Sequence, residues 1–150
     1  MDATALYDNI PNTEGLETLG EALDERINPK VPNGFIQRMM ELVLEWNLFE
    51  FHEASYLQKV GVAMGIHPAP NYSDIFMARR VDNKIWQIVE RLKQEEINKN
   101  PLLLLLLKRF LDDLFLIFQG TTKQIHKLFK EINKIHASIQ FIIYIVYHLE

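Results

Sequence analysis

The feature that most constrains the fold is an apolar run from Leu102 to Phe118 that contains two adjacent aspartates, Asp112 and Asp113. Apart from these acids, only Lys108 and Arg109 interrupt the run. Burying two carboxylates among leucines and phenylalanines costs several kcal/mol unless a cation meets them. A tight turn between two buried strands avoids this cost, because it lifts both carboxylates to the rim of a sheet. The run therefore predicts an apolar β-hairpin with both aspartates at its turn.

Two interpretations of this acidic turn are open. A divalent metal ion at the rim of the sheet would supply the positive charge that two neighbouring carboxylates need. Alternatively, Asp112 and Asp113 form a solvated turn that has no ligand. The stretch alone does not favour either interpretation.

Composition limits the class of protein. A chain of 150 residues with 48% apolar and 24% charged residues suits one globular domain and excludes wholesale disorder. Cysteine is absent, which excludes disulfides and thiolate metal sites. The five histidines show no paired ligand spacing, so we interpret them as loop and surface residues. The net charge of −4 argues against a stand-alone nucleic-acid binder but is compatible with a carboxylate site.

Membrane and secretion signals are not evident. The first ten residues lack a basic region followed by an apolar one. The leucine run before Lys108 and the apolar stretch from Phe141 to Tyr147 are both too short to span a bilayer. We expect no membrane partner and an intracellular protein, without a distinction between nucleus and cytoplasm.

Helical periodicity appears twice before residue 50. A first helix is expected after Asn12 or Thr13, and its apolar face consists of Leu16, Leu19, Leu23 and Ile27. A second helix follows the break at residues 28–34, and its apolar stripe consists of Phe35, Ile36, Met39, Met40, Val43, Leu44 and Trp46. Alternation then predicts a hairpin of Phe49–Phe51 and Tyr56–Val60, joined by residues 52–55. The hairpin leads into a glycine- and proline-rich loop, Gly61 to Pro70.

The second half predicts a long helix from about Tyr72 to Asn98, the central hairpin, a helix capped by Gly120–Thr122, and a final strand from Ala137 to Tyr147. No linker is long enough to divide the chain. This order of elements predicts an α+β fold, with one antiparallel sheet and helices packed on one of its faces.

Three of these stretches resemble the palm motifs of reverse transcriptases, in the same order. Asp2 is followed five residues later by an aromatic residue, Tyr7. The loop from Gly61 to Pro70 is similar to the second motif, and Phe110-Leu-Asp-Asp113 is similar to the third. The resemblance covers nearly the whole chain.

In four stretches, the individual residues resemble those of the Penelope-like retroelements. The similar stretches are Asp2 to Pro11, the Phe-Glu-Phe hairpin at 49–51, Gln58 to Pro70, and Arg109 to Asp113. Met64 stands where most reverse transcriptases carry glutamine, and Ala69 stands where they carry serine. Both residues resemble the Penelope-like pattern.

The resemblance implies a partial reverse transcriptase domain over residues 1–150, with the palm and part of the fingers, without the thumb, and truncated at both ends. The implied activity is template-directed DNA synthesis on RNA by two-metal nucleotidyl transfer. Asp2, Asp112 and Asp113 would be the catalytic residues and would hold two Mg²⁺ ions, or Mn²⁺. We expect Asp2 and Asp112 to be the main ligands on adjacent strands, and Asp113 the lesser one, because neighbouring side chains on a strand diverge.

The resemblance also implies the nucleotide and template contacts. Tyr7, Met64 and Gly65 would bind the incoming nucleotide, with the Tyr7 ring excluding a 2′-hydroxyl. Gly61 and Pro70 would contact template or primer. The implied partners are an RNA template, a DNA primer and deoxynucleoside triphosphates.

The strand that leads into the first motif of the family is missing here, so we expect Asp2 to be poorly held. We also expect no polymerisation by the isolated chain, and self-association at the open sheet edge. The alternative is a catalytically inactive retroelement remnant that acts as an interaction module. Metal binding distinguishes the two.

Overall fold

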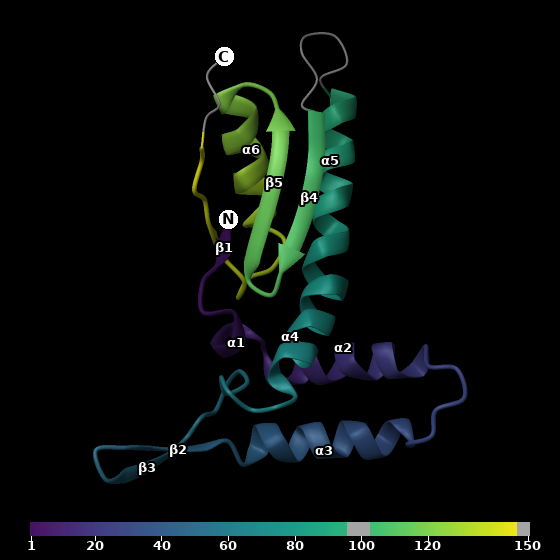
Figure 1. The fold of residues 1–150 in the computed structure, drawn as a ribbon, viewed down its shortest axis with the longest axis vertical. Helices are drawn as coiled ribbons and strands as arrows, with labels where there is room; N and C mark the ends of the chain where they lie inside the picture. Colours follow the sequence, from purple (N-terminus) through teal and green to yellow (C-terminus); the bar gives the residue numbers. More distant parts are fainter. Residues whose placement is uncertain (96–102, 147–150) are drawn as a thin grey trace. The chain divides into compact units, whose positions relative to one another are not determined.

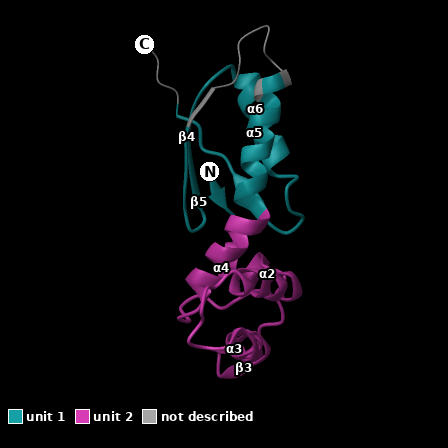
Figure 2. Cartoon of the chain, turned by 90° about the vertical axis from the view of Figure 1, so that its right-hand side faces the viewer, with its two compact units in different colours: residues 1–4, 81–150 teal, residues 5–80 magenta. Residues whose placement is uncertain are grey.

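The computed structural model describes residues 1–95 and 103–146 of the chain. The chain forms two compact units, which Figure 2 shows in different colours. Unit 1 consists of Met1–Thr4 and Val81–Glu150, and unit 2 consists of Ala5–Arg80. The acidic hairpin therefore belongs to unit 1, and the glycine- and proline-rich loop belongs to unit 2.

Unit 1 contains a four-stranded antiparallel sheet (Figure 1). Its strands are β1 (Asp2–Ala3), β4 (Leu103–Phe110), β5 (Asp113–Gln119) and β6 (Phe141–Ile142). The spatial order is β4-β5-β1-β6, which places the short strand β1 inside the sheet. The predicted α+β class with an antiparallel sheet is confirmed. The predicted hairpin is present within the described residues, from which Leu102 is left out. Asp113 belongs to β5 rather than to the turn, and the strands are not buried on both faces, since Phe110, Phe115 and Ile117 are exposed.

Helices α5 (Asn83–Glu95) and α6 (Thr122–Ile132) cover one face of this sheet (Figures 1 and 2). Along β5 the side chains alternate: Leu114 is buried, whereas Asp113 and Phe115 are exposed. The helices turn their apolar stripes inward, and the buried residues are Ile85, Val89 and Leu92 of α5 and Ile125, Leu128 and Ile132 of α6. The other face of the sheet is therefore open, and it carries Asp113.

Helix α6 begins as its sequence predicts. Thr121 is the N-cap, and a capping box joins it to Gln124 in both directions. The Gln124 amide donates to the Thr121 hydroxyl, and the Gln124 side chain accepts from the Thr121 amide. Such reciprocal bonds satisfy two backbone donors at a helix start.

Unit 2 is mainly helical. Its elements are α1 (Leu6–Asn9), α2 (Asn12–Asp24), α3 (Asn33–Glu45), β2 (Leu48–Phe51), β3 (Ala54–Leu57) and α4 (Ala69–Met77). A π-helical turn, η1 (Ala78–Asp82), follows α4 and leads into α5. The buried side chains that form the core of unit 2 include Leu6, Ile10, Leu19, Leu23, Met40, Leu44, Val62, Phe76 and Met77.

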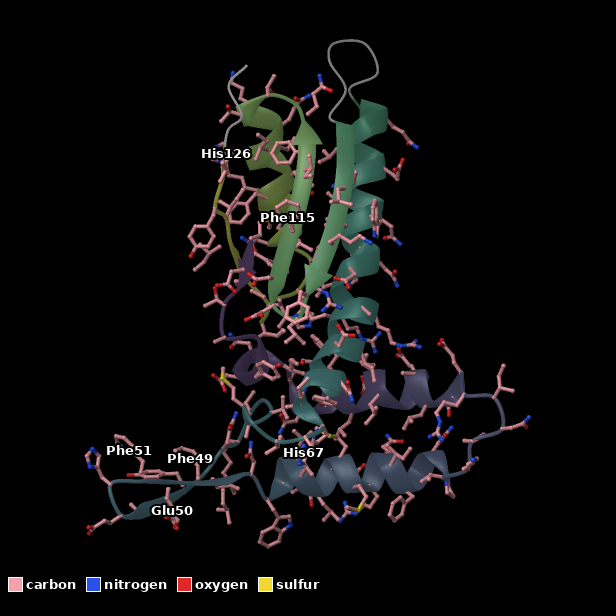
Figure 3. All side chains as sticks on the ribbon, in the orientation of Figure 1. Phe49, Glu50, Phe51, His67, Phe115 and His126 are labelled. Atoms are coloured by element: carbon pink, nitrogen blue, oxygen red, sulfur yellow. The ribbon has the colours of Figure 1, made fainter. Side chains whose placement is uncertain are left out.

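The β2–β3 hairpin has a tighter connection than its sequence predicts. Only His52 and Glu53 form the turn, and both have positive φ, 47° and 61°. Two-residue turns of this kind match the twist of the flanking strands. Every residue of both strands is exposed, and Phe49 and Phe51 project from the ribbon in Figure 3.

Three predicted elements differ from the structure. Ile27 is exposed because α2 ends at Asp24, before the apolar stripe reaches it. The long helix predicted from Tyr72 is instead α4, η1 and α5, and residues 96–98 lie outside the described part. Of the final strand predicted from Ala137 to Tyr147, only Phe141–Ile142 forms a strand within residues 137–146, and Tyr147 lies outside the described part. At its start, the Asn133 side chain donates to the carbonyl of Phe141 and accepts from its amide.

Tyr72 leads to a first prediction. It lies on α4 and is only 3% exposed, and its hydroxyl has no hydrogen-bond partner among the described residues. Burial raises the pKa of this phenol. Because an unsatisfied buried hydroxyl is unfavourable, we expect Tyr72→Phe to raise the free energy of unfolding by about 1 kcal/mol.

The pH dependence tests the cause of that gain. The folded state favours the neutral phenol, so wild-type stability is full below pH about 10, the ordinary pKa of tyrosine, and falls as pH rises further. Tyr72→Phe should reduce this alkaline loss in urea titrations at pH 7 and 10.5. Tyr144→Phe, at an exposed position, is the control and should change neither value. A less stable Tyr72→Phe would show that the hydroxyl has a favourable partner.

Candidate functional site

Strand β1 holds Asp2 from both sides. On one side, Met1 and Leu114 exchange two hydrogen bonds: the terminal amine donates to the Leu114 carbonyl at 2.9 Å, and the Leu114 amide donates to the Met1 carbonyl at 2.7 Å. The Ala3 amide donates to the Asp112 carbonyl at 2.9 Å. On the other side, β1 pairs with β6. The expectation that Asp2 is poorly held is therefore wrong.

Asp2 lies directly opposite Asp113 in the antiparallel ladder of β1 and β5. The hydrogen bonds on either side of this pair join its neighbours, Met1 to Leu114 and Ala3 to Asp112. Such a non-hydrogen-bonded pair brings Cα atoms to about 4.5 Å and Cβ atoms to about 4.5–5.5 Å, with both side chains on one face. Like charges placed directly opposite destabilise a sheet. A bound cation would therefore stabilise this pair of carboxylates.

Asp112 occupies a different position from the one expected. The turn of the hairpin is Leu111–Asp112, and β5 begins at Asp113. Asp112 is half-buried, and its backbone carbonyl is bonded to β1. The expectation that Asp112 lies on the strand beside Asp2 is therefore wrong, because Asp113 takes that position and Asp112 lies in the turn.

Arg109 holds the acidic turn in place through hydrogen bonds to Leu111 and Asp82. Its Nη1 donates to the Leu111 carbonyl at 3.0 Å, and its Nε donates to the two carboxylate oxygens of Asp82 at 3.0 and 2.9 Å. The side chains of Arg109 and Asp82 are only 10% and 25% exposed. Leu111 has a φ of 51°, which leucine rarely adopts, so the turn needs such external support.

Sequence reasoning missed the roles of Arg109 and Asp82. A signal for Arg109 was available, since it lies opposite Leu114, whose side chain is buried. A cation on the covered face of a sheet requires a partner. The partner, Asp82, lies 27 residues earlier in the chain, and no local pattern indicates it.

The residue types at the rim suit magnesium. Within residues 1–95 and 103–146, no group of three His, Asp or Glu side chains is placed to hold a metal ion. Mg²⁺ does not require three protein ligands, because it is usually bound by one or two carboxylates together with waters and substrate phosphates. Asp2 is half-buried and Asp113 is exposed, so both remain accessible from the open face. Two accessible carboxylates are the number that Mg²⁺ usually takes from a protein.

Tyr7 and Gly61 meet within unit 2. The Tyr7 carbonyl accepts a hydrogen bond from the Val62 amide at 2.9 Å. Gly61 has a φ of 81°, and a Cβ added there would lie 2.5 Å from the Tyr7 carbonyl oxygen. Asn12 accepts from the Gly61 amide at 2.9 Å. Two motifs that are more than 50 residues apart are thus packed backbone to backbone, at a position where Gly61 is buried.

The remaining predicted contacts lie on the surface of unit 2. Met64 is 66% exposed. Gly65 has a φ of 91° and open space around the position of its missing Cβ. Pro70 is exposed in the first turn of α4, a position that suits proline. The structure thus groups Asp2, Asp112 and Asp113 in unit 1, and Tyr7, Gly61, Met64, Gly65 and Pro70 in unit 2.

Comparison with known protein families, curated proteins and solved structures finds no match to this chain. None of the helices in the part of the chain that the structure describes is long and apolar enough to cross a membrane. The geometry of the acidic rim and the order of the three motifs are therefore the basis for a functional proposal.

Proposed function

We propose that this chain is the palm part of a Penelope-like reverse transcriptase, which performs template-directed DNA synthesis on RNA. The observation that carries the proposal is the pair of Asp2 and Asp113, directly opposite each other on the open face of an antiparallel sheet. The order of the three motifs in the sequence supports it.

Charge and backbone position favour a metal site at this pair over an ordinary solvated turn. Both carboxylates come from backbone positions fixed by hydrogen bonds, so they cannot separate by moving their strands apart. Asp112 lies at the adjoining turn but does not join the pair in a three-acid site. A divalent cation relieves the repulsion and binds oxygen ligands of this type.

In the proposed reaction, the primer 3′-oxygen forms a bond to the α-phosphorus of a deoxynucleoside triphosphate, and pyrophosphate leaves. Bound Mg²⁺ would stabilise negative charge on the attacking and leaving oxygens. The residues of unit 1 supply position: Asp2 and Asp113 offer oxygen ligands from paired strands, and Arg109 holds the turn that carries Asp112. By the resemblance, Tyr7, Met64 and Gly65 of unit 2 would bind the nucleotide and Pro70 would contact template or primer. Gly61 does not fit the template contact expected of it, because it is buried against the backbone of Tyr7 and Asp8.

Metal binding is the direct test. We expect the wild-type protein to bind Mn²⁺ in titrations followed by electron paramagnetic resonance. Asp113→Asn and Asp2→Asn each remove one proposed ligand. Each should weaken Mn²⁺ binding by at least about 10- to 100-fold, because the loss of an outer-shell partner alone typically costs that much affinity. Glu17→Gln removes the same charge from an exposed site on α2 and should leave the affinity unchanged.

Equal Mn²⁺ affinity in Asp113→Asn and the wild type would overturn the site. Primer extension on an RNA template with Mg²⁺ or Mn²⁺ adds a catalytic readout. If the wild type extends the primer and Asp113→Asn does not, Asp113 is required for catalysis as well as for metal binding.

The alternative function is an inactive retroelement remnant that serves as an interaction module. The exposed apolar side chains of the β2–β3 hairpin favour it, since Leu48 and Phe51 are 62% and 60% exposed. An exposed apolar patch of this kind often marks a surface that binds another protein. A wild-type protein that binds no Mn²⁺ would favour this alternative.

A further inference from the structure

Helix α3 carries two apolar stripes. The first faces the core of unit 2, where Met40 and Leu44 are buried and α3 packs against α2 (Figure 1). The second stripe, which we call the outer seam, consists of Phe35, Met39, Leu42 and Trp46. Three of its four side chains are exposed: Phe35 by 59%, Met39 by 47% and Trp46 by 71%. A helix of a globular protein ordinarily has one apolar stripe, so a second stripe that faces water indicates a surface that binds a partner.

The outer seam has the spacing of a coiled-coil helix. Its members recur at intervals of four, three and four residues, which matches the a and d positions of the heptad repeat. At about 100° per residue they fall within about 60° of one another around the helix axis, on the side away from Met40 and Leu44. Trp46 comes just after α3 but continues its spiral, because its amide donates to the Leu42 carbonyl at 3.0 Å. The outer seam can therefore pack against another helix along the whole length of α3.

The spacing of the outer seam is the same when the helix is read backwards. A second α3 that runs antiparallel to the first therefore places Phe35 opposite Trp46 of the second copy, and Met39 opposite Leu42 of the second copy. Contacts between two aromatic rings stabilise an interface beyond the area that they bury. Each ring at one end of the helix thus meets a ring of the other copy, and the aliphatic side chains meet in the middle.

The charges beside the outer seam match on reversal as well. Arg38 and Glu45 lie on one flank, at g positions when Met39 and Trp46 are assigned to a positions, and their side chains are 58% and 54% exposed. In an antiparallel pair of α3 helices, each Arg38 faces Glu45 of the second copy. In a parallel pair Arg38 would face Val43, and neither charge would gain a partner. Since charges at such positions set the choice and orientation of the partner, the pattern favours an antiparallel second copy over an unrelated helix.

We propose that the outer seam of α3 binds the outer seam of a second copy of this chain, antiparallel about a two-fold axis at the middle of the helix. A two-fold interface uses the same patch on both copies, which is why it requires this self-complementarity. At about 150–250 Å² a ring and the exposed fractions of Phe35 and Trp46, the four rings supply on the order of 500 Å². Exposed Val31 and Leu48 lie beyond the two ends of α3, and the reversal brings these ends together. Asp2 and Asp113 do not contribute, so the dimer does not rest on the proposed metal site.

Sedimentation equilibrium of the full chain is the first test. We expect a dimer that forms at concentrations on the order of 10–100 µM, because interfaces below about 1,200 Å² are typically weak. Trp46→Glu places a charge in the outer seam and should raise the dimer dissociation constant by at least about tenfold. Trp86→Glu is the matched control, since Trp86 is 46% exposed on α5 of unit 1 and should leave the constant unchanged. Melting temperatures are measured for both variants.

Disulfide cross-linking tests the orientation of the two helices. The chain has no cysteine, so an introduced cysteine has no competitor. Mixed Met39→Cys and Leu42→Cys chains should form a disulfide-linked dimer, because the antiparallel pairing places these two positions opposite each other. Each variant alone should cross-link at least about tenfold more slowly, since its two cysteines lie outside disulfide reach. Faster linkage of Met39→Cys to itself would show a parallel pair and would overturn the proposal.

Charge reversal tests the choice of partner. Arg38→Glu alone places two carboxylates opposite each other and should weaken the dimer, whereas Arg38→Glu combined with Glu45→Arg exchanges the charges and should restore it. Asp113→Asn should dimerise as the wild type does, which separates this proposal from the metal site. A chain that stays monomeric up to about 500 µM, or a dimer that Trp46→Glu leaves intact, would overturn the proposal. Loss of the dimer in Phe51→Glu but not in Trp46→Glu would assign self-association to the β2–β3 hairpin and would also overturn it.

Discussion

Gly61→Ala should make unit 2 much easier to unfold. The new Cβ would lie 2.5 Å from the Tyr7 carbonyl oxygen and 2.6 Å from the Asp8 Cα, and both are backbone atoms that cannot rotate away. Alanine also pays about 1–2 kcal/mol for a left-handed backbone, and overpacking adds about 1–3 kcal/mol. We expect a loss of about 3 kcal/mol in the free energy of unfolding, measured by urea titration.

Gly65→Ala is the matched control for this prediction. Gly65 has a similar φ of 91°, but nothing lies within 4 Å of the position where a Cβ would be added. Its substitution should therefore show only the backbone part, about 1–2 kcal/mol. Equal losses in the two variants would mean that close packing of Gly61 on Tyr7 contributes nothing, and that the two motifs of unit 2 are not held together there.

Arg109→Met should destabilise unit 1 by about 2 kcal/mol, because it removes the charge-assisted hydrogen bonds that the half-buried guanidinium donates to Asp82 and Leu111. The substitution keeps the length of the side chain but leaves the Asp82 carboxylate and the Leu111 carbonyl without the guanidinium. Thermal and urea unfolding measure the loss. Arg38→Met is the control, since Arg38 forms only exposed ion pairs on α3 and should cost less than about 1 kcal/mol.

The conservative variant separates stability from positioning. Arg109→Lys keeps the charge but loses the fork that reaches both Asp82 and Leu111. We expect it to remain folded and to bind Mn²⁺ more weakly, because the turn beside Asp2 and Asp113 is less firmly held. If Arg109→Met were as stable as the wild type, Arg109 would not support the turn.

The sequence predicted those parts of the fold that depend on local pattern. The central hairpin, the capping of α6 at Thr121 and the antiparallel α+β class all follow from apolar alternation and capping chemistry. These signals lie within a few residues of each other, so tertiary packing does not need to be known.

The partner of Asp2 could not be predicted, because a shift of one residue changes the face on which a strand side chain lies. The turn length decides between Asp112 and Asp113, and it depends on Leu111 accepting a φ of 51°. That conformation is supported by Arg109 and Asp82, which are brought together only by the fold. The buried position of Gly61 against Tyr7 depends in the same way on distant residues.

The pairing of Met1 with Leu114 has a consequence for biosynthesis. These residues are 113 positions apart, and β1 also pairs with β6 near the end of the chain. Strand β1 is thus made before unit 2 and its neighbours β5 and β6 are made after it, whereas unit 2 is one continuous segment, Ala5–Arg80. Contacts between distant residues form slowly, and chains fold as they leave the ribosome. Unit 2 should therefore fold during translation, before β5 and β6 have been made and can pair with β1.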